Sequence, residues 1–466
     1  MTKTLPELLC SDAWWQRVGP ALTADGRALV KETLTQASAK LDDKEKEKFT
    51  EALTALRAPS PEQLAWLRDV AAVQTLPESV KILDLSDILI CHPDTGAPIN
   101  VVNCQLPAVT FNRSVFAGEA RFLLATFAGD ATFHYATFAG DAFFWGATFT
   151  SKASFLQATF AGWANFRQVT FRGEASFHYA TFRQEANFLQ ATFMGEADFE
   201  GVTFRGGADF QQTEFLGITI FRKAKFTAVA TFHAARFGKT VSFRGSDWGA
   251  VPDFIGTAWK DGVAVADFEQ LQTKLNKGEL DWRDPSTSTP ITDRLQALRK
   301  MARDADDRPR ELDYFALELQ ARYQGKGAWA WAKRFLVSLY GWFSDYGRGV
   351  FLPLRGLLEL CLLSMLCYWV LADGDGSILS KDRLFAMTYG VLPDVDWSLW
   401  DNALLFSLVN ALPPLGASSW VRESILKASY CEEVRSLVGF IAVGEGVIGL
   451  ILLFLIALGL RNRFRL

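Results

Sequence analysis

The fold is decided by a stretch in the first half of the chain, residues 125–160, which reads ATFAGD-ATFHY-ATFAGD-AFFWG-ATFTSK-ASFLQ-ATF. Phe recurs there in steps that alternate between five and six residues, and the alternation runs without a slip from Phe111 to Phe243. Trp248 continues the series by one more five-residue step. Two positions before nearly every Phe stands a small residue, usually Ala, and a Thr, Ser, Asn or Asp separates the two. The pattern therefore repeats every eleven residues, with one small and one large apolar side chain in each unit.

This period predicts a chain that turns a corner every five or six residues and points both apolar side chains inward. A helix is excluded, because steps of about 5.5 residues walk around a helix instead of holding one face. The units resemble pentapeptide repeats, whose fold is a right-handed quadrilateral β-helix with the small and the large residue inside. The resemblance implies 22 residues per coil and six coils between Phe111 and Phe243. We assign the β-solenoid to residues 111–248 and, since the open end of a solenoid needs covering, a cap to residues 76–110.

Three histidines lie within the repeats. His134 and His178 are 44 residues apart, which is two coils, so they share one face at a separation of about 9.6 Å. His233 falls on the opposite face. One metal ion cannot bridge such distances, and we expect solvated surface side chains, no metal site and no cofactor.

The N-terminal region, residues 1–75, is expected to be helical. Residues 60–63 (SPEQ) combine an N-cap serine, a first-turn proline and a capping-box glutamine. The acidic run 42–47 (DDKEKE) is interpreted as a solvated helix face rather than a binding tract. Trp14 and Trp15 are expected to pack within this region, the alternative being anchors for a partner.

Two further segments connect the repeats to the C-terminal part of the chain. Residues 249–327 are assigned to a helical linker or oligomerisation region, in which Leu295, Leu298 and Met301 share one side of a helix. Residues 328–350 are rich in Trp, Phe and Tyr and contain Lys and Arg. That mixture is typical of an amphipathic helix lying at a membrane surface.

Residues 351–466 are assigned to a transmembrane module. Two apolar stretches, 351–372 and 437–460, are long enough to cross a hydrocarbon core of about 30 Å. Their connection, residues 373–436, holds five Lys and Arg against nine Asp and Glu, whereas Lys and Arg flank the other ends of both stretches. The positive-inside rule then predicts a multi-pass protein of the inner (cytoplasmic) membrane, with both termini in the cytosol and the lipid bilayer as a partner.

A third apolar run, residues 403–415, is shorter and suits a re-entrant half-helix. Span, half-helix, breaker and span is the order found in the pore module of two-transmembrane potassium channels, and residues 290–466 resemble a divergent copy. Residues 344–347 and 460–464 also resemble membrane proteins that join pentapeptide repeats to such a module. The chain departs from the pattern where a TVGYG-type filter would stand. The filter-equivalent positions are Asn410, Ala411, Leu412, Pro413, Pro414, Leu415 and Gly416.

Glu445 is the one charge in the second apolar stretch. An ionisable group in the middle of a membrane is costly and by default suggests a function, facing water or the interior of a bundle. The other interpretation is a protonated side chain that bonds to a neighbouring helix. Gly444, Gly446 and Gly449 surround Glu445 and are expected to allow close helix packing.

The first apolar stretch carries an oppositely charged pair. Arg355 and Glu359 are four residues apart and therefore share one face of a helix. We interpret them as an intrahelical ion pair, with a role in gating as the alternative.

Charge and motifs limit the classes of function. A net charge of −4 over 466 residues gives no bulk attraction to nucleic acid. No nucleophile–base pair, metal-ligand spacing or phosphate loop indicates an enzyme. Two hypotheses remain: an oligomeric channel-like pore, tetrameric if built like a channel, with the cytosolic solenoid as sensor or docking domain, or a non-conducting membrane-tethered scaffold whose solenoid binds a protein. A third, the DNA imitation by which soluble pentapeptide proteins protect topoisomerases, requires an acidic and untethered rod and is disfavoured.

Overall fold

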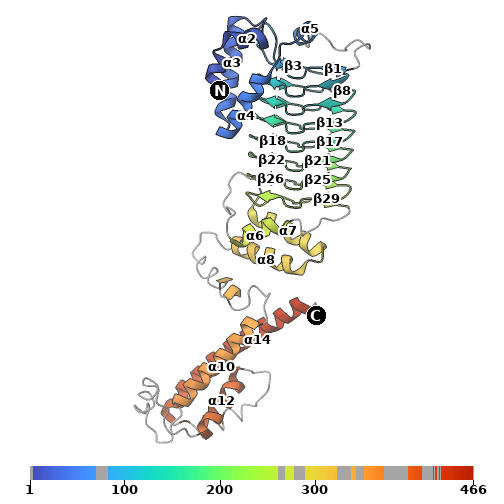
Figure 1. Cartoon of the computed structure of the whole chain (residues 1–466). Helices are drawn as coiled ribbons and strands as arrows, with labels where there is room; N and C mark the ends of the chain where they lie inside the picture. The colour runs from blue at the N-terminus through green and yellow to red at the C-terminus, as the bar shows by residue number, and fades with distance from the viewer. Residues whose placement is uncertain are drawn as a thin grey trace. The chain divides into compact units, whose positions relative to one another are not determined.

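The computed structural model contains two compact units, residues 1–314 and 315–466. The first holds the solenoid and its flanking helices, and the second holds the apolar helices (Figure 1). The described residues are 4–69, 82–260, 268–277, 289–322, 337–338, 340–342, 351–371, 397–411, 423, 426–427, 430 and 432–464.

The repeats fold into a solenoid of four parallel β-sheets whose coils have the predicted length of about 22 residues. Strands one coil apart are paired, for example Thr137 opposite Thr159 and Phe138 opposite Phe160. Each coil contributes one short strand to each sheet, and three of the sheets have eight strands and one has seven. The solenoid therefore has about eight coils, because it extends beyond the stretch from Phe111 to Phe243 for which six were predicted.

The strands are two or three residues long and alternate among the four sheets along the chain. The first sheet comprises β1 (Ile82–Asp84), β5 (Ala108–Thr110), β9 (Ala131–Thr132), β13 (Ala153–Ser154), β17 (Ala175–Ser176), β21 (Ala197–Asp198), β25 (Thr219–Ile220) and β29 (Val241–Ser242). The second comprises β2 (Leu89–Ile90), β6 (Val115–Phe116), β10 (Thr137–Phe138), β14 (Thr159–Phe160), β18 (Thr181–Phe182), β22 (Thr203–Phe204), β26 (Lys225–Phe226) and β30 (Asp247–Trp248). The third comprises β3 (Ile99–Asn100), β7 (Ala120–Arg121), β11 (Ala142–Phe143), β15 (Ala164–Asn165), β19 (Ala186–Asn187), β23 (Ala208–Asp209) and β27 (Ala230–Thr231). The fourth comprises β4 (Gln105–Leu106), β8 (Thr126–Phe127), β12 (Thr148–Phe149), β16 (Thr170–Phe171), β20 (Thr192–Phe193), β24 (Glu214–Phe215), β28 (Arg236–Phe237) and β31 (Ala258–Trp259).

Phe rings fill the interior of the solenoid in stacks that follow its axis. Phe133 and Phe155, one coil apart, have ring centroids 4.7 Å apart and planes inclined by 4°. Phe144 meets Phe155 edge to face at 5.7 Å and 84°. Both geometries suit the quadrupole of an aromatic ring. Because each ring is fully buried, each contributes roughly 1.5–3 kcal/mol of hydrophobic free energy before conformational entropy is subtracted.

The two step lengths correspond to two kinds of corner. In the five-residue step that starts at Phe133, the Ala136 N–H donates to the Phe133 carbonyl (3.1 Å) and Tyr135 has φ 59°, the pattern of a type II turn. A positive φ recurs at every eleventh residue, whereas the six-residue corners of the described coils lack one. In several coils the polar residue before the Phe that starts a five-residue step supports that corner, as where the Asn165 side chain accepts a hydrogen bond from the Arg167 N–H (3.0 Å). The alternation between five-residue and six-residue steps thus corresponds to an alternation between two types of turn.

The solenoid begins earlier than predicted. Residues 82–110, expected to form a separate cap, themselves form β1 to β5 of the first coils. Leu106 pairs with Phe127 and holds the core position that Phe takes later. The Phe period did not reveal these coils because their core positions hold Leu, Ile and Val.

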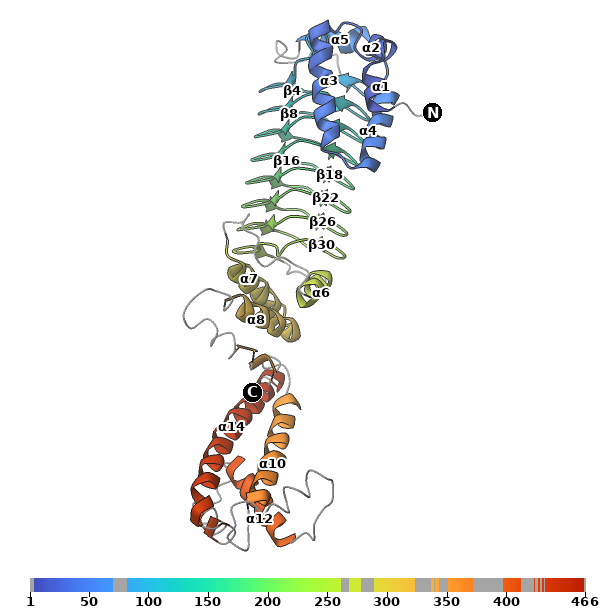
Figure 2. The ribbon, with the colours of Figure 1, turned by 90° about the vertical axis from the view of Figure 1, so that its left-hand side faces the viewer.

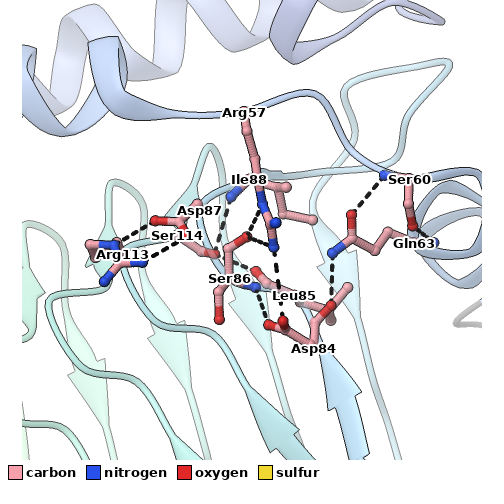
Figure 3. Close-up of polar contacts among 10 residues, drawn as sticks. All are labelled: Arg57, Ser60, Gln63, Asp84, Leu85, Ser86, Asp87, Ile88, Arg113 and Ser114. Atoms are coloured by element: carbon pink, nitrogen blue, oxygen red, sulfur yellow. Dashed lines mark hydrogen bonds and ion pairs between the residues drawn. The ribbon is translucent and has the colours of Figure 1, made fainter.

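The open edge of the first coil is closed by polar side chains from the N-terminal region (Figure 3). The Arg57 guanidinium donates to the Ser86 carbonyl through Nε (3.2 Å) and Nη2 (3.1 Å). The Gln63 amide donates to the Asp84 carbonyl (2.7 Å) and also completes the predicted capping box with Ser60. In later coils such carbonyls accept from the N–H groups of the neighbouring coil. Arg57 and Gln63 therefore supply the hydrogen-bond donors that the preceding coil supplies elsewhere in the solenoid.

The N-terminal region is helical, as expected. Its helices are α1 (Leu5–Leu9), α2 (Asp12–Val18), α3 (Ala24–Ala39), α4 (Asp43–Ala55) and α5 (Pro61–Asp69). Trp14 and Trp15 are buried, and their indole N–H groups donate to the carbonyls of Leu53 and Leu9, each at 2.9 Å. Both tryptophans thus pack within this region. Figure 2 shows α3 and α4 lying lengthwise along the solenoid.

These helices pack against one column of outward side chains on the solenoid. Its first three members, one coil apart, are Ala117, Ala139 and Ala161. The next two members are Arg183 and Arg205. Arg205 contacts the carboxylates of Asp42 (2.7 Å) and Glu45 (2.9 Å), and Arg183 also contacts Glu45. The interpretation of 42–47 as a solvated face is therefore wrong for these two acids, because the distant Arg partners could not be read from local sequence.

Among the described residues between the solenoid and residue 322 are three helices. They are α6 (Glu269–Lys277), α7 (Ile291–Asp304) and α8 (Arg308–Arg322). The Phe stacks continue beyond Trp248 through Phe254 and Trp259, so residues 249–260 belong to the solenoid and not to a linker. Phe268, directly before α6, is 1% exposed and lies against Phe243 with ring centroids 5.3 Å apart. Phe268 closes the far end of the aromatic core.

The described residues of the second unit include three long helices. They are α10 (Phe351–Leu371), α12 (Trp397–Ala411) and α14 (Glu432–Phe464). In the part of this unit that the structure describes, two segments are long and apolar enough to cross a membrane, Phe351–Trp369 and Arg435–Leu458, and 28% of the most apolar stretch of each is buried. Of the predicted surface helix at 328–350, the structure describes residues 337–338 and 340–342, which are helical; the rest lies outside the described residues.

Two adjacent phenylalanines test the contribution of the stacks. Phe144 is 0% exposed and stacks on Phe122 (5.0 Å) and Phe166 (4.8 Å), whereas Phe143 points outward from the third sheet. Phe144→Ala should lower the free energy of unfolding by about 3–5 kcal/mol, measured from denaturant titrations followed by circular dichroism. Phe143→Ala, the matched control, should cost about 1 kcal/mol or less. Equal costs would contradict this account of the core.

Candidate functional site

The helices α10, α12 and α14 enclose a polar centre in an otherwise apolar core. The buried positions of α14 recur every three or four residues and so form one face of the helix. They are Val438, Ala442, Glu445, Gly449, Leu452 and Leu455. The helical period therefore places the carboxyl of Glu445 among its apolar neighbours.

Glu445 is 3% exposed and bonds to both other helices. The Tyr368 hydroxyl of α10 donates to Oε2 at 2.6 Å. The Ser407 hydroxyl of α12 lies 2.6 Å from Oε1 and 2.9 Å from the carbonyl of Cys361. Ser364 also lies beside the carboxyl. Of the two interpretations of Glu445, this arrangement corresponds to the side chain that bonds to neighbouring helices.

Sequence reasoning did not single out the hydroxyl partners. Ser364 and Tyr368 are four residues apart, which puts them on one face of α10, and both are buried. Ser407 is 0% exposed on α12. The available signal was the spacing of hydroxyl groups within apolar stretches, but such groups are common there because they can bond to their own helix.

The third helix differs from the predicted half-helix. α12 begins at Trp397, six residues before the predicted start at 403, and packs against both α10 and α14. Leu412, Pro413, Pro414, Leu415 and Gly416 of the filter-equivalent segment lie outside the described residues. Ala411 and Asn410, its other two members, are 0% exposed.

Asn410 is the least satisfied polar side chain of this core. Its amide lies beside the phenol of Tyr368, one turn from Ser407 on α12. Beyond this contact with Tyr368, neither its Nδ2 nor its Oδ1 forms a hydrogen bond of normal geometry among the described residues. A buried amide without such hydrogen bonds costs free energy, so this group is available to any new partner that enters the centre.

The three glycines near Glu445 differ in the space that surrounds them. A Cβ added to Gly449 would collide with the carbonyl of Ala411, and one added to Gly446 would lie 3.3 Å from the carbonyl of Asn410. Gly444 has open space around it. Close packing of α14 on α12 thus depends on Gly449, and to a lesser degree on Gly446, but not on Gly444.

Arg355 and Glu359 form the expected ion pair on α10. The Arg355 Nε donates to Glu359 Oε1 at 2.6 Å, and the two side chains are 76% and 59% exposed. The pair lies on the outer face of α10, away from the polar centre. Its neighbours on that face are Leu352, Leu354, Leu358, Leu362 and Leu363.

The solenoid histidines have local partners. His134 Nε2 lies 2.8 Å from the Ser154 hydroxyl, and burial, reinforced by Lys152, lowers the pKa of His134. His178 Nδ1 lies 3.1 Å from a carboxylate oxygen of Asp198. In the part of the chain that the structure describes, no cluster of His, Cys, Asp or Glu could hold a metal ion.

The fold and the repeat together define the class of the first unit, a pentapeptide-repeat β-solenoid. A family model described as pentapeptide repeats (9 copies) matches residues 111–159, 125–170, 135–181 and 166–213. Comparisons with curated proteins and with solved structures gave no match. No finding supports the resemblance of the C-terminal region to a potassium-channel module.

The two contrasting glycines give a test of the helix packing. Gly449→Ala should separate α12 from α14, because the new methyl group meets the backbone of Ala411; overpacking of this kind typically costs about 1–3 kcal/mol. Gly444→Ala should be neutral or stabilising by up to about 1 kcal/mol, since Ala favours a helix. Thermal unfolding of the purified protein in detergent measures both. Destabilisation by Gly444→Ala, or none by Gly449→Ala, would contradict the described packing.

Proposed function

We propose that this protein is a membrane-anchored scaffold whose pentapeptide-repeat solenoid binds a partner protein. The observation that carries the proposal is a patch of exposed aliphatic side chains at the corner of the solenoid between the fourth and the first sheet. Met194, Leu216 and Ile218 are exposed there by 48%, 45% and 46%. Met194 and Leu216 follow paired strands and therefore lie above one another in adjacent coils.

The position of the patch suits a partner. It lies at the corner between the fourth and the first sheet, whereas the N-terminal helices pack against the second sheet and the corner that follows it. Ile220, which continues the patch on β25, stands where most coils have Thr, Ser or Asp. Contiguous exposed apolar side chains of this kind mark interaction sites on otherwise polar surfaces.

The anchor is formed by α10 and α14. A core helix of a soluble protein would be mostly buried, but only 28% of the most apolar stretch of each segment is buried here. Side chains such as Phe440 (80% exposed) and Phe454 (64%) project from α14 without cover in the described residues. Lipid would cover them. The distribution of Lys and Arg favours the inner (cytoplasmic) membrane with both termini in the cytosol and the connection between α10 and α14 outside.

Two leucines of similar exposure test the scaffold. Leu216→Glu should abolish capture of the partner from native membranes by the full-length protein, because it puts a charge into the patch. Leu124→Glu, at another corner and 47% exposed, should leave capture unchanged. Identified partners are compared by quantitative mass spectrometry. Equal capture by both variants, or a folded protein that retains no specific partner, would refute the scaffold.

A second candidate function, an oligomeric pore, is favoured by the Arg355–Glu359 pair. An exposed ion pair surrounded by leucines is costly in lipid unless water or another copy of the chain covers it. A homo-oligomer, tetrameric if channel-like, would place the pair at an interface or along a water path.

Ion flux into liposomes that contain the purified protein tests this candidate. Wild-type protein should conduct, and Arg355→Ala should reduce the flux by leaving Glu359 unpaired. Leu358→Ala, on the same exposed face (61% exposed), should conduct like wild type. A folded protein that is silent across voltage and pH would eliminate the pore.

A further inference from the structure

The buried centre around Glu445 contains three close oxygen–oxygen contacts, and the two hydroxyl groups that form them cannot supply all three with hydrogens. The three close contacts are Tyr368 to Oε2 (2.6 Å), Ser407 to Oε1 (2.6 Å) and Ser407 to the Cys361 carbonyl (2.9 Å). Each contact requires a hydrogen between its two oxygens, since two lone pairs repel at such distances. Tyr368 and Ser407 carry one hydroxyl hydrogen each, and the Ser364 hydroxyl, which also lies beside the carboxyl, takes part in none of these three contacts. The third hydrogen must come from the carboxyl group.

One arrangement satisfies all three contacts. Tyr368 donates to Oε2, Ser407 donates to the carbonyl of Cys361, and a hydrogen on Oε1 of Glu445 is donated to the Ser407 oxygen. An ionised carboxylate would leave one contact without a hydrogen. We infer that Glu445 is a proton-binding site, occupied at neutral pH, that joins α10, α12 and α14.

The surroundings favour the neutral form of the carboxyl. Glu445 is 3% exposed, and Tyr368 and Ser407 are 0% exposed. A buried ionised carboxylate requires a cation to compensate for lost hydration. Within the described residues no Lys or Arg contacts Glu445, and the closest Arg of α14, Arg435, donates instead to the carbonyl of Tyr430 (3.0 Å).

Few other titratable groups face the site. α10 contributes the Tyr368 phenol and the Cys361 thiol, and Glu359 lies on its outer face. α12 contributes the uncharged Ser407 and Asn410, while its Asp401 is exposed. No opposing charge therefore drives the proton off Glu445 from the described helices.

Asn410 gives the site a second state. When the proton leaves for water, the O–H bond of the carboxyl breaks and its electron pair remains on Oε1. Ser407 must then turn its hydrogen to Oε1 and release the Cys361 carbonyl. The Asn410 amide, which has two N–H donors and forms no hydrogen bond of normal geometry among the described residues, is placed beside Tyr368 to donate to the new negative charge. Loss of the proton thus loosens the link between α10 and α12.

Infrared difference spectra of the full-length protein in nanodiscs test the inference. The spectrum of wild type minus Glu445→Gln at neutral pH should show the C=O stretch of a protonated carboxylic acid. Glu359→Gln is the matched control, because Glu359 is exposed and paired with Arg355, and its difference spectrum should show carboxylate bands. Carboxylate bands for Glu445 would overturn the inference.

Thermal stability provides an independent measurement. Gln has the shape of a protonated Glu, with an oxygen that accepts from Tyr368 and an N–H that donates to Ser407, so Glu445→Gln should unfold within about 2 °C of wild type. Glu445→Ala should unfold roughly 5–10 °C lower. A large loss with Gln, or a wild-type stability that rises with sodium or potassium concentration at constant ionic strength, would indicate an ionised carboxylate with a bound cation and overturn the inference.

Discussion

The structure of the first unit depends on the contact between each phenylalanine and its counterpart one coil further along the chain. That contact sets the length of a coil, because rings stack at 4.4–5.2 Å only if the backbone returns to the same corner. Because the backbone returns to the same corner, the N–H and carbonyl groups of neighbouring coils also come within hydrogen-bond distance. Alternating turns of two kinds divide each coil among four corners, and Ala leaves room for each ring.

A stack of identical units has no intrinsic end, so both ends require different chemistry. At the first coil, Arg57 and Gln63 provide the hydrogen-bond donors that a preceding coil would have provided. At the last coil, Phe268 continues the aromatic core with a residue that belongs to no strand. The first coil leaves backbone carbonyls without donors and is closed by polar side chains. The last coil leaves aromatic rings uncovered and is closed by an apolar side chain.

The sequence was most informative where one interaction repeats. The eleven-residue repeat followed from the Phe spacing, the 22-residue coil from the resemblance to pentapeptide repeats, and the Arg355–Glu359 pair from helical spacing. The first coils were missed because Leu106 and its counterparts replace Phe. Glu45 was misjudged because its partners, Arg183 and Arg205, belong to coils far along the chain. The hydroxyl groups around Glu445 could not be assigned, since a Ser or Tyr within an apolar helix is equally compatible with a bond to its own backbone.

The N-terminal helices also determine where the solenoid can change length during evolution. α4 has 13 residues and is therefore about 20 Å long, close to the four coil spacings of about 4.8 Å between Ala117 and Arg205. Insertion or loss of a whole coil in this interval would move Arg183 and Arg205 out of register with Glu45, although the core would remain intact. The coils after Arg205 carry no such constraint from α4. Duplication and deletion of repeats should therefore accumulate in the second half of the solenoid, and the first half should keep its length among descendants of this chain.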